Sequence, residues 1–232
     1  ELRFLSNNNI VDKIATAKLL IASRKALDIG FDKLKTSRFL EKQNLPYPQT
    51  HLVSQVEEVE SYPVILKSRH GSGSSNVHIV YDLDTYQFIK KQNSDFIVQE
   101  YLNDKHGEFT CGLFRSQKGE TRAIIFKREL IGGFSGYGEV ADNSEIRNIL
   151  FKIAEKLELN GSINVQLRLT SKGPMVFEIN PRFSSTVRFR HLFGFKDVEW
   201  CIEDKMNKPI STYNEVAVGK KFYKGFNEYI SE

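Results

Sequence analysis

Two neighbouring segments in which apolar and polar residues alternate place the strongest constraint on how this chain folds. Every second residue is apolar from position 163 to 169, and a similar alternation runs from 175 to 180. A period of two is typical of half-buried strands. The residues between include Gly173, which suits the last, left-handed position of a three-residue loop at 171–173. The sequence therefore predicts a β-hairpin, whose second strand has an apolar face of Met175, Phe177 and Ile179.

The predicted register pairs polar side chains across the hairpin. With Lys172 at the centre of the loop, Gln166 lies opposite Glu178, and Asn164 lies opposite Asn180. A slip of one residue would move all of these side chains to the other face. The register is therefore a sharp prediction about the structure.

The polar face of this hairpin would bring oxygen and guanidinium groups together. It would carry the Glu178 carboxylate, two or three amide oxygens, and the guanidinium of Arg168 or Arg182. Mg²⁺ prefers oxygen ligands, and an Arg side chain offers a fixed fork to phosphate or carboxylate. The pattern indicates a metal and phosphate site. A polar, solvent-facing edge hairpin is the alternative, and it is the commoner explanation of alternation taken alone.

A second region points independently to phosphate. Residues 62–67 have the pattern of a strand ending at Lys67, and residues 68–77 form a segment rich in Gly and Ser. Backbone N–H groups of such a loop can surround phosphates, and Lys67 would add a point charge. The residues do not follow the GxxxxGK[ST] pattern that precedes a helix. A simple hairpin turn is the alternative for this loop.

Composition bounds the class of protein. The 232 residues are 40% hydrophobic and 27% charged, as in globular proteins with a substantial core. The net charge of +4 suits an anionic ligand, but no long Lys/Arg block favours nucleic acid. No apolar run approaches about 20 residues, so we expect no membrane span. Cys111 and Cys201 lack metal-ligand spacing, which favours buried thiols and a reducing, cytoplasmic location.

Helical and β-type segments mix along the chain, which predicts an α+β fold. Apolar residues at helical spacing predict helices at 1–30 (with Ile10, Ile14, Ala17 and Ile21), 32–44 and 143–159. Short β-type runs cover 62–67, 77–81, 96–100, 108–114 and 122–126, with glycine loops at 71–73 and 132–138. Residues 184–207 are expected to be mostly helical or irregular, and 216–230 to form a short β-type tail.

Two further segments have the character of a nucleotide pocket. Residues 96–102 form an apolar strand that ends at a polar edge, where the backbone could hydrogen-bond a purine base. Glu108 begins the next strand, on the face of Thr110, and could accept hydrogen bonds from ribose hydroxyls. A solvated carboxylate at a strand end is the alternative for Glu108.

In this order, the segments resemble the ATP-grasp superfamily, and within it the carboxylate–amine ligases similar to the large subunit of carbamoyl phosphate synthase. Each motif is weak alone, but the ordered set is specific. The motifs are Asp32-Lys33, Leu45-Pro46-Tyr47-Pro48, Pro63–Lys67 with its loop, Val98–Leu102, Gly107-Glu108, Asn164-Val165-Gln166 and Phe177–Arg182.

The resemblance implies ATP as cofactor, together with Mg²⁺ and with Mn²⁺ as an alternative. The residues expected at the ATP phosphates are Lys67 and Lys33, with Lys35 or Arg38 as alternatives to Lys33. The residues expected to hold adenine, partly by backbone, are Gln99, Glu100 and Leu102, and Glu108 would bind ribose. The expected metal ligands are Gln166, Glu178 and Asn180.

Arg182 and a second basic residue are implied at the reacting groups. Arg182 would face the transferred phosphate, and Lys127 or Arg128 would approach phosphate or substrate. Ser184-Ser185-Thr186 stands where relatives usually carry glycine, which would tighten this loop against the substrate or weaken activity. A basic cluster follows at Arg188, Arg190 and His191, for which a solvated helix face is favoured over a site for an anionic substrate.

The family fold implies two α+β subdomains that hold the nucleotide between them. Residues 31–210 would form the ATP-grasp domain, with 47–96 as a small mobile lid and 97–210 as the large subdomain. Relatives carry a Rossmann-like domain before this unit. The chain begins with Glu1 rather than Met, so residues 1–30 would be the tail of that domain or a linker helix, and 211–232 a C-terminal β-type extension.

The implied activity is that of an ATP-dependent ligase. A carboxylate would attack the γ-phosphate of ATP, and an amine or similar nucleophile would capture the acyl-phosphate. The expected partners are small-molecule carboxylate and amine substrates, with no nucleic acid and no membrane, and a homodimer is compatible with the resemblance. The alternatives are an ATP-binding module that has lost catalysis, an ATP-grasp kinase, and a nucleic-acid-binding protein supported by the net charge alone.

Overall fold

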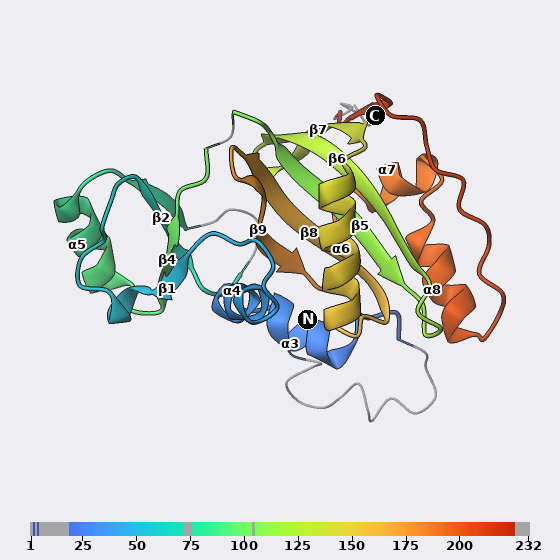
Figure 1. Cartoon of the computed structure of the whole chain (residues 1–232), viewed down its shortest axis with the longest axis horizontal. Helices are drawn as coiled ribbons and strands as arrows, with labels where there is room; N and C mark the ends of the chain where they lie inside the picture. Colours follow the sequence, from blue (N-terminus) through green and yellow to red (C-terminus); the bar gives the residue numbers. More distant parts are fainter. Residues whose placement is uncertain (1, 3, 5–18, 72–75, 104, 226–232) are drawn as a thin grey trace, which may run out of the picture.

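The chain folds around two antiparallel β-sheets of different size. A computed structural model describes residues 2, 4, 19–71, 76–103 and 105–225. Figure 1 shows a smaller lobe containing β1, β2, β4 and α5 beside a larger lobe with long strands. The α+β prediction is confirmed.

The larger sheet has six strands in the order β10-β7-β6-β5-β8-β9. Its strands are β5 (Glu108–Arg115), β6 (Thr121–Ile131), β7 (Phe134–Ala141), β8 (Gly161–Thr170), β9 (Gly173–Asn180) and β10 (Lys221–Tyr223). β5 pairs with β6 on one side and with β8 on the other, so Glu108 at its start has a neighbour on each side. This position matters for the site described below.

Helices cover both faces of the larger sheet. α3 (Arg24–Gly30), α4 (Lys33–Lys42) and α6 (Ser144–Lys156) pack on the face that buries Cys111, Ile163 and Val176. α7 (Val187–Leu192) and α8 (Asp197–Lys205) pack on the opposite face with Phe114, Phe126 and Trp200. Side chains two residues apart in a strand lie on the same face of the sheet, so Glu108 shares a face of β5 with Phe114. This is the face that α7 and α8 cover.

The smaller sheet has four strands in the order β1-β4-β2-β3. They are β1 (Thr50–Leu52), β2 (Val64–Ser68), β3 (Val77–Val80) and β4 (Phe96–Glu100), accompanied by the 3₁₀ helix η1 (Val53–Gln55) and by α5 (Leu83–Gln92). Val53, Leu66 and Tyr86 belong to the hydrophobic core of this smaller lobe. β4 pairs with both β1 and β2, so this sheet continues to Glu100.

β8 and β9 form the predicted hairpin, and the predicted register holds on the far side of a bulge, at Gln166 and Asn164. Gln166 pairs with Glu178, and Asn164 pairs with Asn180. The loop has two residues rather than three, because Thr170 already pairs with Gly173, whose φ is +98°. The register shifts by one residue between this loop and Gln166, which is the mark of a β-bulge.

The bulge changes which side chains of β9 reach the core. Leu167 pairs with Val176 while Gln166 pairs with Glu178, so Phe177 is the extra residue. Val176 is completely buried in the core, whereas Phe177 lines a cavity together with Glu178. The apolar face predicted for Met175, Phe177 and Ile179 is therefore wrong, because the bulge interrupts the alternation.

The glycine loop predicted at 132–138 is also wrong. β6 and β7 continue to a turn at Gly132-Gly133, and the later glycines lie within β7. A Cβ on Gly138 would lie 2.2 Å from the Phe222 ring, so this glycine serves close packing rather than a loop. α5, β1 and β7 were not predicted, and in the described part of the predicted β-type tail, residues 216–225, the strand is β10 with three residues.

Other predictions concern the beginning of the chain. Ile10, Ile14 and Ala17 lie outside the described residues, and Ile21 precedes α3.

In the part of the chain that is described, no helix has the length and apolar character that crossing a bilayer requires.

Candidate functional site

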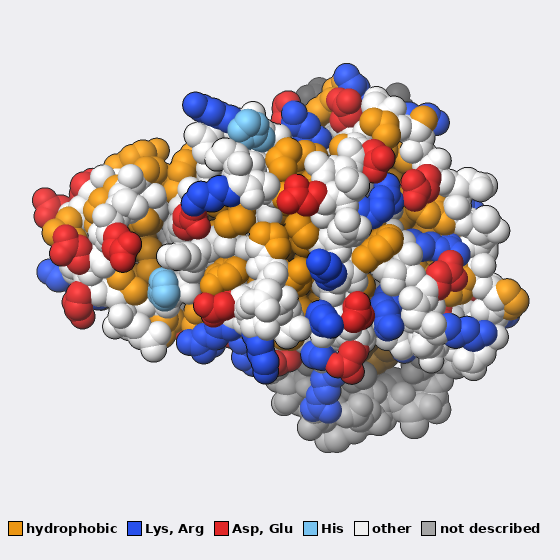
Figure 2. Space-filling view, viewed as in Figure 1, with side chains coloured by type: hydrophobic (Ala, Val, Ile, Leu, Met, Phe, Trp, Pro, Cys, Tyr) orange, Lys and Arg blue, Asp and Glu red, His pale blue; other side chains and the backbone are white. Residues whose placement is uncertain are grey.

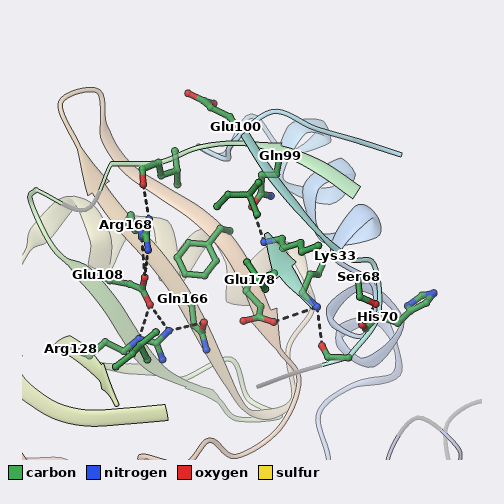
Figure 3. Close-up of a pocket in the computed structure, with 17 residues that line it drawn as sticks. Lys33, Ser68, His70, Gln99, Glu100, Glu108, Arg128, Gln166, Arg168 and Glu178 are labelled. Carbon is green, nitrogen blue, oxygen red and sulfur yellow. Dashed lines mark hydrogen bonds and ion pairs between the residues drawn. The ribbon is translucent and has the colours of Figure 1, made fainter. Parts of the chain in front are cut away.

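A cavity of about 260 Å³ is lined by residues of both sheets and of α4. Apolar side chains of its wall include Ile65, Leu102 and Phe177. The charged residues that line it are Lys33, Lys67, Glu100, Glu108, Arg128, Arg168 and Glu178. Figure 3 shows all of these with labels except Lys67. A cavity with apolar walls and convergent charged groups is the usual form of a small-molecule site.

Lys67 on β2 is the most deeply buried cation of this cavity. Its Nζ donates to Oε1 of Gln99 at 2.8 Å and lies 5.6 Å from the centre of the Phe177 ring. Burial lowers the pKa of Lys67 to about 8, although the Glu178 carboxylate opposes the shift. An anionic ligand would restore the charged form of this lysine.

Lys33 lies at the start of α4. Its Nζ donates to the carbonyl of Gly71 at 2.8 Å and lies 3.8 Å from Oε1 of Glu178, and its burial lowers its pKa. Lys35, an alternative from the sequence, is exposed and bonds to Asp28 instead. Arg38 lines a different pocket beside Tyr47. Among the three candidate cations, the structure brings Lys33 to the cavity.

Glu108 joins two arginines from the strands on either side of it. Oε1 accepts from Nε and Nη2 of Arg128 at 3.0 and 2.6 Å, and Oε2 accepts from Nε of Arg168 at 2.9 Å. The pairing of β5 places both arginines directly opposite Glu108. Glu108 is therefore a partly buried, paired carboxylate, and the solvated strand-end alternative is wrong. The neighbouring Lys127 is exposed.

A smaller polar pocket of about 90 Å³ adjoins the cavity. Arg128, Gln166 and Glu178 line both spaces. Asn180, Arg182, Thr110, Ser135, Ser184 and Ser185 complete most of the smaller pocket's wall. Arg182 also donates to the carbonyl of Phe183 at 3.1 Å. A molecule in the cavity and a second one in this pocket would therefore meet at Arg128, Gln166 and Glu178.

The three predicted metal ligands come together in the smaller pocket. Gln166, Glu178 and Asn180 lie on paired strands and line the same pocket, offering one carboxylate and two amide oxygens. Oε1 of Gln166 accepts from Nη2 of Arg128 at 2.9 Å. This oxygen donor set fits Mg²⁺, which commonly uses one or two carboxylates together with substrate phosphates and water.

The three residues predicted to hold adenine line the cavity, but their side chains are engaged differently. The Gln99 side chain is bonded to Lys67 and Thr50. The Glu100 side chain points away from Lys33 and Glu178 in Figure 3 and accepts from the Gln49 N–H at 3.3 Å. The Leu102 carbonyl accepts from Arg168 at 2.6 Å. Contacts from this segment to a base would therefore come from its remaining backbone groups.

The basic cluster of Arg188, Arg190 and His191 was expected to form a solvated helix face, and at Arg190 this expectation is wrong. Arg190 is completely buried, and its Nη2 lies 3.2 Å from Oδ2 of Asp197. Arg188 and His191 are exposed. Gly112 makes room for the Arg190 guanidinium, and this packing between distant segments leaves no local trace in the sequence. Cys111 and Cys201 are buried and free, as expected, and burial raises the pKa of each to about 12.

Sequence reasoning missed several participants of the site. Phe177 faces the cavity only because of the bulge, and Thr50 lies on a strand that was not predicted. Arg69, which follows β2, binds the carboxylate of Asp32 at the start of α4. The sequence could have indicated that Asp32 caps a helix, since Asp is a favoured residue before a helix. It could not have indicated that Arg69 is the partner of Asp32.

The fold and the site define a two-lobed α+β protein with a cavity suited to an anionic small molecule. The model of the ATP-grasp domain family matches residues 31–186, so the chain belongs to the ATP-grasp family. The family expectation from the sequence is thereby confirmed.

Two curated relatives and two solved structures illustrate the likeness. The carbamoyl phosphate synthase large chain of Sulfurisphaera tokodaii is 25% identical over 205 residues, 78% of this chain and 19% of that protein. The large chain of Archaeoglobus fulgidus is 26% identical over 195 residues, 75% of this chain and 18% of that protein. The chain thus spans about a fifth of the length of these relatives.

Among solved structures, the biotin carboxylase domain of the 2-oxoglutarate carboxylase of Hydrogenobacter thermophilus, with MgADP, ADP and bicarbonate, superposes with a TM-score of 0.78. It is 13% identical and covers 94% of this chain and 55% of that chain. The N5-carboxyaminoimidazole ribonucleotide synthetase of Thermus thermophilus gives a TM-score of 0.72 at 16% identity, covering 86% and 57%. These likenesses establish the ATP-grasp fold.

Proposed function

We propose that this chain is the ATP-grasp unit of an ATP-dependent carboxylate–amine ligase. It activates a small carboxylate as an acyl-phosphate, which an amine or similar nucleophile then attacks. The observation that carries the proposal is the junction between the cavity and the smaller polar pocket, where Arg128, Gln166 and Glu178 line both spaces. Transfer of a phosphoryl group requires that donor and acceptor meet at one point.

The cavity takes the nucleotide in this proposal. Lys33 and Lys67 bind its phosphates, because both are buried cations with few competing solvent contacts. Glu108 accepts from the ribose hydroxyls, and the segment containing Gln99, Glu100 and Leu102 receives the base. The apolar side chains of Ile65, Leu102 and Phe177 pack against the purine.

The smaller pocket takes the carboxylate substrate. Arg182 and Arg128 hold and neutralise its charge as the acyl-phosphate forms, and electrostatic stabilisation of this kind is often the largest catalytic contribution. Mg²⁺ held by Gln166, Glu178 and Asn180 would supply charge neutralisation for the phosphates. The hydroxyls of Ser184 and Ser185 line the same pocket, so they replace the usual glycine with hydrogen-bonding groups.

A second candidate is an ATP-grasp kinase, in which the acceptor keeps the phosphoryl group. The hydroxyl-rich and arginine-containing wall of the smaller pocket is compatible with this outcome. The residues of the smaller pocket's wall, which include Gln166, Glu178 and Asn180, support a catalytic unit over a catalytically inactive module. The proposal also includes three expectations from the resemblance. They are a mobile lid at 47–96 with a large subdomain at 97–210, a homodimer, and a cytoplasmic location.

Nucleotide binding and turnover test the proposal in two steps. With Mg·ATP at about 100 times its dissociation constant, binding should add roughly 2.7 kcal/mol to the free energy of unfolding, or about 5–10 °C in Tm. The shift should shrink with chelator and be absent with Mg·GTP. ADP release is then screened with carboxylates alone and with carboxylates plus amines; ADP release that never depends on an amine, together with a phosphorylated product, would favour the kinase. No thermal shift with Mg·ATP would contradict both candidates.

A further inference from the structure

Three adjacent strands of the smaller sheet contribute a line of buried polar side chains that ends at Lys67. Thr50 lies on β1, Gln99 on β4 and Lys67 on β2, and Thr50 pairs directly with Gln99 across the sheet. The exposed fractions of Thr50, Gln99 and Lys67 are 8%, 4% and 7%. Buried polar groups at these positions need defined partners, because leaving one unpaired is costly.

The hydrogen bonds along this line run in one direction. The Thr50 hydroxyl donates to the carbonyl of Pro48 at 2.7 Å. Nε2 of Gln99 donates to the Thr50 oxygen at 2.8 Å, and Lys67 donates to Oε1 of Gln99 at 2.8 Å. A carbonyl can only accept and an ammonium group can only donate, so the single hydroxyl proton of Thr50 is committed to Pro48.

This commitment determines the orientation of the Gln99 amide. The Thr50 oxygen can offer only a lone pair to Gln99, so the amide must present its N–H₂ to Thr50 and its oxygen to Lys67. The reversed amide would bring N–H donors against the Lys67 ammonium and leave the Thr50 oxygen unpaired. Thr50 thus favours the same orientation of Gln99 that the Lys67 ammonium requires.

The charges that face Lys67 are balanced in number. Glu178 on β9 and Glu108 on β5 favour its charged form, while Lys33 on α4 and Arg168 on β8 oppose it. Burial also opposes the charged form. Gln99 Oε1 accepts from Lys67 at 2.8 Å, and a hydrogen bond that the charged form donates favours that form.

We propose that Thr50 is a positioning residue that orients the Gln99 amide and thereby holds Lys67 as an ammonium group directed at the cavity. The consequence for nucleotide binding rests on the proposed function, whereas the link from Thr50 to Lys67 does not. Thr50 need not touch the nucleotide. Its effect passes through Gln99.

The test measures the protonation of Lys67 in the protein without nucleotide. Lysine side chains are labelled with ¹³C and ¹⁵N, the Lys67 signal is assigned with Lys67→Arg, and its titration is followed by NMR. The midpoint of the Lys67 titration in the wild-type protein should correspond to a pKa of about 8. Thr50→Val removes the acceptor for Gln99 and should lower the midpoint by about one pH unit, as expected for a hydrogen bond to a charged group.

Two variants serve as controls. Thr50→Ser keeps the hydroxyl and should restore the wild-type midpoint. Thr36→Val removes a comparable buried hydroxyl, which donates to the Ile29 carbonyl at 2.9 Å in the larger lobe, and should leave Lys67 unchanged. If Thr50→Val does not fold, Thr50→Ala removes the same hydroxyl without placing a methyl group against Pro48, and the same lowering is expected.

Affinity for Mg·ATP provides the second measurement. At pH 8 Thr50→Val should bind on the order of fivefold more weakly than wild type, because a one-unit shift reduces the charged fraction of Lys67 by that factor. An unchanged Lys67 midpoint in Thr50→Val or Thr50→Ala, or failure of Thr50→Ser to restore it, would overturn the role of Thr50. A shifted midpoint with no nucleotide binding to any variant would leave that role intact and reject the proposed function.

Discussion

Asp32 and Arg69 join the two lobes of this protein through one carboxylate. Nη2 of Arg69 lies 2.7 Å from Oδ2 of Asp32, and Nε of Arg69 lies 2.9 Å from Oδ1. The same carboxylate accepts from the backbone N–H groups of Leu34 and Lys35 and so begins α4. α4 carries Lys33, and Arg69 follows the strand that carries Lys67. The ion pair therefore sets the spacing between the two lysines of the cavity.

Replacing Asp32 with Asn should separate these two roles. Asn still caps a helix but cannot form the ion pair, so we expect the free energy of unfolding to fall by about 1–3 kcal/mol. Asp82→Asn is the matched control, since Asp82 caps α5 at an exposed position and should change stability by about 0.5 kcal/mol or less. Urea denaturation measures both values. Equal losses in the two variants would mean that the ion pair with Arg69 adds nothing.

The contribution of Asp32 should depend on pH in a defined direction. Burial opposes ionisation of Asp32, but hydrogen bonds from Arg69 and from the Lys35 backbone, with the charge of Arg69, outweigh it and lower the pKa. A lowered pKa means that the stabilisation is fully present above the ordinary pKa and is lost as pH falls through the folded-state pKa. The advantage of wild type over Asp32→Asn should therefore persist at pH 5–7 and diminish only below about pH 4.

Lys67→Met should stabilise the protein while weakening nucleotide binding. Holding a buried lysine with a pKa of about 8 costs on the order of 3 kcal/mol at neutral pH, and loss of the bond to Gln99 costs about 1 kcal/mol. We expect a net gain of about 1–3 kcal/mol at pH 7. Lys156→Met, an exposed lysine of α6, is the control and should change little.

The pH dependence of this effect has a predicted sign. The unfolded chain binds more protons than the folded one between the folded pKa of about 8 and the ordinary value of 10.5, so wild-type stability gains from Lys67 as pH rises through this window. The advantage of Lys67→Met should therefore be large at pH 7 and smaller at pH 10. Chemical denaturation at the two pH values measures it, and an advantage that grows with pH would contradict the burial argument.

Glu178→Gln should abolish ATP-dependent turnover without unfolding the protein. The substitution removes the single carboxylate of the predicted metal set, which lies between the cavity and the smaller pocket. Loss of a group that acts on developing charge commonly costs about 10²–10³ in kcat. ADP release is compared with that of Glu155→Gln, an exposed position on α6. Full activity in Glu178→Gln would refute the metal assignment.

Gly112→Ala should destabilise the larger lobe. A Cβ at this position would lie 2.2 Å from Nη1 and 2.6 Å from Cδ of Arg190, whose side chain is completely buried beside Asp197. Because the guanidinium cannot move into solvent, we expect a loss of about 1–3 kcal/mol. Gly225→Ala, whose added Cβ would have no atom of the described residues within 4 Å, is the control. Thermal unfolding of both variants distinguishes local crowding from a general effect of removing glycine.

The hairpin and the interior of the lobes differ in how well the sequence predicts them. Alternation predicted the two strands, and the predicted pairing of Gln166 with Glu178 is observed because a two-residue loop and a one-residue bulge together offset the predicted three-residue loop. It failed at Phe177, because a bulge depends on how β9 packs rather than on its own pattern. It also failed at Arg190, where a charged residue in a basic segment is buried by a partner in the next helix.

The sequence by itself determined the α+β class, the two strands of the β8–β9 hairpin and the set of chemical groups available for phosphate and metal, because these follow from local periodicity and residue type. Only the tertiary structure decided that Glu108 lies between Arg128 and Arg168, and that Thr50 orients Gln99 toward Lys67. These contacts depend on the order of strands within each sheet. That order is set by which arrangement buries the apolar surface of the whole chain most favourably, which no local pattern specifies.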